Sequence, residues 1–100
     1  MQAEVQMRFQ VVVSIKPATS ADFDLPVNWE DVLISRLADS ADVDGHDLGA
    51  GEFNVFILTD DPSGTFKAIQ SLPETKQLAR SMECSYRTIF GNDYTILWPE

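Results

Sequence analysis

Three side chains of this 100-residue sequence could take part in catalysis: His46, Asp60 and Cys84. His46 is the only histidine and Cys84 the only cysteine, and a histidine beside a thiol can act as the base that activates it. Asp60 follows an apolar segment, and carboxylates at strand ends often carry function in open α/β sheets. Nothing in the spacing brings the three side chains together. A small hydrolase or ligand-binding domain that uses them is therefore the alternative hypothesis, and an enzyme is not the favoured one.

The segment from Asp42 to Asp47 has alternating aspartates followed by glycine, as calcium-binding loops do. When Gly45 takes the sixth position of an EF-hand loop, the twelfth falls on Gly51, where the loop requires a glutamate. We therefore expect a solvated turn and no cofactor. A divalent-cation site at Asp42, Asp44 and Asp47 remains a third hypothesis.

The elements that must position these residues begin with strands. Alternating apolar and polar residues predict a strand over 5–15. A second strand is predicted over 53–59, where apolar residues occupy both faces, as is typical of a central strand. Alternation over 84–98 around a glycine-containing turn at 91–93 predicts a hairpin at the end of the sequence.

Helices are predicted between these strands. The first spans about 28–41, with Asn28 as its N-cap and Asp31 in its first turn. Its buried stripe is predicted to contain Trp29, Val32, Leu33 and Leu37. The second begins where Asp61 caps and Pro62 takes the first helical position, and a short third helix follows Pro73 over 73–82.

Two segments read as irregular. Residues 17–26 are rich in Ser, Thr and Asp and are predicted as a loop. Residues 42–51 contain three glycines and three aspartates, and we expect a turn region with a weak edge strand around 46–48.

The order of elements predicts one α+β domain over 1–100. The predicted order is β-α-β-β-α-β-β. This order matches a ferredoxin-like α/β sandwich with an extra C-terminal strand and with helices on one face of the sheet. A thioredoxin-like mixed sheet is the runner-up, and it lacks the usual redox cysteine pair. Apolar residues on both faces of 53–59 suggest that the other face is partly apolar and a candidate homodimer surface.

The net charge of −9 is concentrated in one part of the chain. Residues 22–61 contain eleven acidic residues and a single base, Arg36. This balance argues against nucleic acid and against anionic membranes as partners. Solubility is the simplest explanation of the charge, and attraction to a basic protein is the more specific one.

The favoured hypothesis is a non-enzymatic interaction module, of immunity or adaptor type, that binds a basic protein partner through an acidic surface. Its candidate binding residues are Asp39, Asp42, Asp44, Asp47, Glu52 and Asp60. A lone cysteine, the absence of a long apolar run and the lack of a signal-like start favour a cytoplasmic protein.

Residues 51–62, followed by Phe66-Lys67-Ala68-Ile69, and the closing segment 94–99 carry a resemblance. Over about a third of the chain, the sequence is similar to a group of small uncharacterised bacterial single-domain α/β proteins. The resemblance implies a stand-alone bacterial domain and carries no activity with it.

Overall fold

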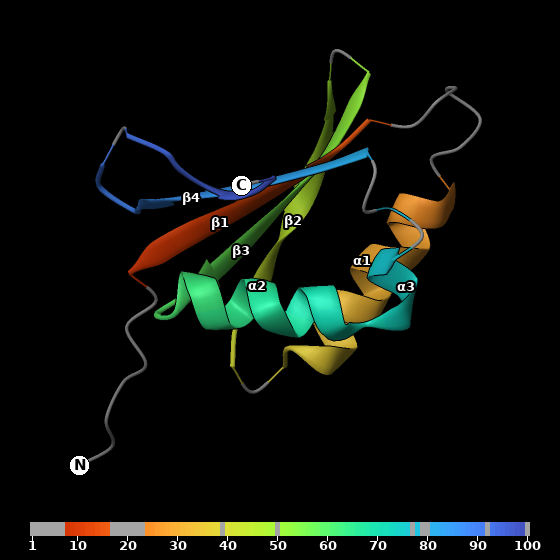
Figure 1. The fold of residues 1–100 in the computed structure, drawn as a ribbon, viewed down its shortest axis with the longest axis horizontal. Helices are drawn as coiled ribbons and strands as arrows, with labels where there is room; N and C mark the ends of the chain where they lie inside the picture. The colour runs from red at the N-terminus through yellow and green to blue at the C-terminus, as the bar shows by residue number, and fades with distance from the viewer. Residues whose placement is uncertain are drawn as a thin grey trace.

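The computed structural model describes residues 8–16, 24–38, 40–49, 51–76, 78, 81–91 and 93–99. They form an α+β fold (Figure 1). Its elements are, in chain order, β1 (Phe9–Ile15), α1 (Asp24–Arg36), β2 (Asp42–Gly49), β3 (Glu52–Thr59), α2 (Pro62–Ser71), α3 (Pro73–Lys76), β4 (Met82–Thr88) and β5 (Thr95–Trp98).

The strands form one five-stranded sheet in the order β2-β3-β1-β4-β5, and every neighbouring pair is antiparallel. The first strand of the sequence therefore lies in the middle of the sheet. Val13 is paired with Val55 of β3 on one side and with Cys84 of β4 on the other. The predicted central position of β3 is confirmed, because β3 lies between β2 and β1.

One face of the sheet supplies the core. Alternate residues of β1 are buried, and so are alternate residues of β3. These are Val11, Val13 and Ile15 of β1 and Phe53, Val55, Ile57 and Thr59 of β3. The alternation predicted for the first strand is confirmed over 9–15, and residues 5–7 lie outside the described part of the chain.

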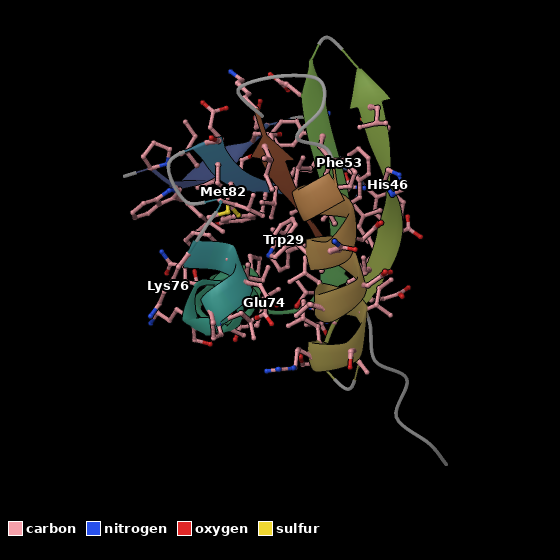
Figure 2. All side chains as sticks on the ribbon, turned by 90° about the vertical axis from the view of Figure 1, so that its right-hand side faces the viewer. Trp29, His46, Phe53, Glu74, Lys76 and Met82 are labelled. Carbon is pink, nitrogen blue, oxygen red and sulfur yellow. The ribbon has the colours of Figure 1, made fainter. Side chains whose placement is uncertain are left out.

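Helices α1 and α2 complete the core. Trp29 and Leu33 of α1 and Phe66 and Ile69 of α2 are buried in the same cluster as the strand residues. The indole Nε1 of Trp29 donates a buried hydrogen bond of 2.9 Å to Thr75 Oγ1 of α3. Figure 2 shows Trp29 on the inner side of α1. This bond satisfies a polar group that would be costly to bury unpaired, and it ties α1 to α3.

The boundaries predicted for the first helix are wrong. The helix begins at Asp24 and ends at Arg36, so Asn28 is not its N-cap and Asp31 is not in its first turn. Pro26 lies within the first turn, where its missing N–H has no intrahelical acceptor to lose. The loop predicted over 17–26 is therefore wrong for 24–26, which belong to α1, and residues 17–23 lie outside the described part of the chain. The predicted stripe is confirmed, since Trp29, Leu33 and Leu37 are buried and Val32 packs against them.

The turn predicted over 42–51 is also wrong, because most of it is the edge strand β2. The weak edge strand predicted around 46–48 is confirmed and extends over the whole of β2. Pairing with the apolar β3 overrides the poor strand propensity of aspartate and glycine. Gly45 has a φ of 126° at a register shift between Val43 and Gly45, a conformation that favours glycine.

The start of α2 is as predicted. Asp61 is the N-cap and its Oδ1 accepts a 3.0 Å hydrogen bond from Gly64 N, with Pro62 in the first position. Helix α3 ends at Lys76, so it is shorter than predicted. The C-terminal hairpin is confirmed as β4 and β5, but Phe90 lies in the turn and is fully exposed.

The cap of α2 gives a stability prediction. Replacing a helical glycine by alanine usually stabilises a protein by about 0.5–1 kcal/mol. A Cβ on Gly64 would overlap the Asp61 carboxylate and displace it from its capping position. Loss of this N-cap should lower the free energy of unfolding by about 1 kcal/mol. We expect Gly64→Ala to be neutral or destabilising in the wild-type chain and stabilising in an Asp61→Ala background. Urea denaturation of the four proteins measures this, and equal effects in both backgrounds would contradict it.

Candidate functional site

His46 of β2 contacts helix α1 through the side chain of Glu30. Its Nδ1 lies 2.8 Å from Glu30 Oε1, and its ring stacks on Phe53 with centroids 4.8 Å apart. Figure 2 shows His46 beside Phe53 on the side of α1 that meets β2. Glu30 is only 8% exposed, and a buried carboxylate is costly unless it is paired. His46 therefore has a structural task, which is to partner Glu30 and hold the edge strand against α1.

The three side chains considered for catalysis do not meet. His46 is paired with Val55, Val55 with Val13, and Val13 with Cys84. His46 and Cys84 are therefore three strand spacings apart, about 14 Å. Asp60 lies five residues beyond Val55, roughly 16 Å along the strand direction. Proton transfer needs hydrogen-bond reach or one bridging water, so this arrangement does not support a shared catalytic site.

Cys84 is not an activated nucleophile. It is 1% exposed, and burial raises the pKa of its thiol to about 12. The thiolate is the reactive form of cysteine, so at neutral pH this side chain stays protonated. It behaves as a small apolar core residue.

Asp60 and Asp61 both have backbone partners. Asp60 Oδ1 accepts a 3.0 Å hydrogen bond from Arg8 N, and Asp61 caps α2. Both line a shallow depression of about 340 Å³ between the end of β3 and the start of α2. The Thr59 and Thr65 hydroxyls of this depression are 2.8 Å apart and hydrogen-bonded to each other. The polar groups here support the β3–α2 connection, although Asp60 itself remains exposed.

The remaining candidate acids gather on the β2–β3 pair. Asp42, Asp44 and Asp47 are exposed on β2, and we call these three residues the acidic edge. Glu52 begins β3, and Asp60 follows β3 at the end where Asp42 is paired with Leu58. Strands β2 and β3 contain no lysine or arginine. Asp39 lies outside the described residues.

Two of these carboxylates have side-chain partners. Asp47 Oδ1 accepts a 3.0 Å hydrogen bond from Asn54 Nδ2, and Glu52 Oε1 lies 3.5 Å from Lys16 Nζ. Asp42 and Asp47, through their pairing with Leu58 and Asn54, lie on the face of the sheet opposite the core. The acidic edge is therefore accessible from solvent, and the hydrogen bond from Asn54 fixes the orientation of the Asp47 carboxylate.

A metal centre at Asp42, Asp44 and Asp47 has no support in the geometry. Across the residues that the structure describes, no three His, Cys, Asp or Glu side chains are grouped closely enough to hold an ion. The extended strand separates Asp42 from Asp47 by several residues, each adding about 3.3 Å.

The face opposite the core contains apolar side chains, as the sequence suggests. Val12, Phe56 and Leu58 are half-buried there, and Ile96 of β5 is 70% exposed. The Tyr86 ring instead packs edge-on against Phe9, with ring centroids 5.7 Å apart, and the ring centroids of Trp98 and Phe66 are 6.3 Å apart. Tyr86 and Trp98 therefore pack against the core. The homodimer through this face stays a prediction.

Glu30 is the partner of His46 that sequence reasoning missed. The signal was present, because Glu30 stands three residues before Leu33 and seven before Leu37, on the buried side of α1. An acid in that position needs a basic partner, and the only histidine is the partner that the structure provides.

Comparisons with protein-family models, with curated proteins and with solved structures found no match in any of the three. In the described part of the chain no helix is both long and apolar enough to cross a membrane.

The pair between His46 and Glu30 predicts coupled effects on stability. We expect His46→Ala to cost about 1–3 kcal/mol of unfolding free energy, because it leaves the buried Glu30 carboxylate unpaired. The same change in a Glu30→Gln background should cost less, with a coupling on the order of 1 kcal/mol. A double-mutant cycle in urea measures the coupling, and Asp44→Asn on the same strand is the control. Additive effects on the free energy of unfolding would show that the contact between His46 and Glu30 does not contribute to stability.

The burial of Cys84 predicts an unreactive thiol. We expect a neutral-pH thiol reagent such as DTNB to leave the folded protein unmodified and to react fully once urea unfolds it. The control is a Cys84→Ala, Ser85→Cys double variant, whose thiol moves to the half-buried position on the other face and should react without denaturant. Rapid labelling of native Cys84 would contradict its buried placement.

Proposed function

We propose that this domain is a non-enzymatic interaction module that binds a basic protein partner through the acidic edge, with Glu52 and Asp60 beside it. The observation that carries the proposal is the set of exposed carboxylates on the β2–β3 pair, whose two strands contain no lysine or arginine. Charge that served solubility alone would have no need to gather at one side of the sheet.

Complementary charge at such a surface increases the rate of association and selects against acidic partners. Leu48 lies on the same strand, on the other face from Asp42 and Asp47, and is 57% exposed, so it offers an apolar contact beside the acidic edge. Interfaces that combine an apolar anchor with a charged rim are common among protein complexes. The separation of His46, Asp60 and Cys84 favours this function over an enzyme.

The ferredoxin-like assignment is part of the proposal. The strand order β2-β3-β1-β4, with β5 added beyond β4, supports it, because two split β-α-β units interleaved in an antiparallel sheet have this order. The labelled helices in Figure 1 lie on one side of the strands, and β1 and β3 bury only alternate residues. A sheet with one uncovered face fits an interaction module.

The binding proposal predicts an effect of charge position rather than of total charge. The test variant is Asp42→Asn, Asp44→Asn, Asp47→Asn. The control is Asp31→Asn, Glu83→Gln, Asp93→Asn, which removes the same charge from exposed positions on α1, β4 and the β4–β5 turn. Immobilised wild type and control should retain a protein partner at low salt and release it at about 0.5 M salt, where charges are strongly screened. The test variant should lose it.

Two results would count against the proposal. If the test variant and the control lose the partner equally, the position of the carboxylates does not matter. If the partner is retained at about 0.5 M salt by all three proteins, charge does not govern binding.

A further inference from the structure

Strand β2 has an unpaired outer edge. It is the first strand in the sheet order and pairs only with β3 among the described residues. Alternate N–H and C=O groups of an edge strand point away from the sheet and can pair with another chain. Recognition by strand addition uses these groups for affinity and the neighbouring side chains for selectivity.

The regular part of this edge follows the bulge. From His46 to Gly49 each residue has a partner in β3 with no register shift, in the pairs His46–Val55, Asp47–Asn54, Leu48–Phe53 and Gly49–Glu52. The pairing of His46 with Glu30 fixes this part against α1. The segment therefore has a regular register and is held against α1, unlike the bulged segment between Val43 and Gly45, and we call 46–49 the template.

The side chains of this template differ on its two faces. Asp47 is on the face opposite the core, as its pairing with Asn54 places it. Leu48 and His46 are on the other face, opposite Phe53 and Val55. A strand added at this edge would place successive side chains next to a carboxylate on one face and next to an exposed leucine on the other.

Charge decides between a second copy and a foreign strand. Pairing of β2 with β2 of another copy would bring the carboxylates of two acidic edges together, and like charges across neighbouring strands are destabilising. A segment with lysine or arginine at alternate positions would instead face opposite charge.

We propose that the β2 edge binds an extended segment of the partner protein in which basic and apolar residues alternate, as an added strand of the sheet. This inference rests on the proposed function and specifies the partner class and the mode of binding. The basic residues lie beside Asp47 and the rest of the acidic edge, and the apolar residues lie beside Leu48. Main-chain hydrogen bonds to β2 hold the segment.

The experiment uses capped synthetic peptides of alternating lysine and valine, of the same length as the eight-residue β2. One peptide is unmodified. Each of the other two has N-methyl groups on alternate amides, so that it loses the N–H donors along one of the two edges of the extended peptide. Affinity for the domain is measured by fluorescence anisotropy. Strand addition predicts that methylation of one edge weakens binding on the order of tenfold, while methylation of the other edge has little effect.

The outcomes separate this inference from the proposed function. If all three peptides bind equally and in a salt-dependent way, the acidic edge attracts basic chains but strand addition is wrong. If none binds at low salt, strand addition is wrong and the proposed function loses support as well. If binding is asymmetric, an Asp47→Lys variant should weaken the lysine–valine peptide and favour a glutamate–valine peptide, whereas Glu83→Gln should change neither.

Discussion

The pairing of β1 with both β3 and β4 is the contact on which the rest of the structure depends. The sheet consists of two hairpins, β2–β3 and β4–β5, and β1 is the strand that joins them. Val11 and Val13 are completely buried at this junction and contact neighbours from both hairpins through the ladder. Because β1 lies in the middle of the sheet, β3 and β4 are the hairpin strands that pair with it, and β2 and β5 become the edges.

The position of β2 explains why its residues are polar. An edge strand with exposed apolar side chains is prone to pair with other chains, and proteins protect such edges with charges and bulges. Strand β2 has both protections, in Asp42, Asp44 and Asp47 and in the register shift before Gly45. The contact of His46 with Glu30 adds an attachment to α1, so that the edge is kept in place although none of its own residues is fully buried.

Local patterns predicted the elements whose residues determine their own structure. The alternation over 9–15 and the Asp61-Pro62 helix start are examples, because strand burial and capping act within a few residues. Only residues 46–48 of β2 were predicted as a strand. Its full length and the start of α1 were not predictable in this way, since β3 provides the template for one and Pro26 is tolerated in the first turn of the other. The candidate acids were found from charge alone. The distance between His46 and Cys84 depends on the strand order β2-β3-β1-β4, which the spacing of the two residues along the chain does not give.

Under the proposed function, protection of the edge and attraction of a partner are two consequences of the same carboxylates. Like charge keeps copies of the domain from pairing at β2, and it leaves the backbone groups of that edge available to a chain of opposite charge. Leu48 distinguishes the two roles, because protection alone gains nothing from a leucine that is 57% exposed in the middle of the regular segment. Among the described residues, the acidic edge combines like charge, an exposed leucine and main-chain groups without a strand partner, and this combination supports the proposed basic partner. Under the proposed function, the carboxylates of the acidic edge select the partner and also disfavour pairing of β2 with β2 of another copy.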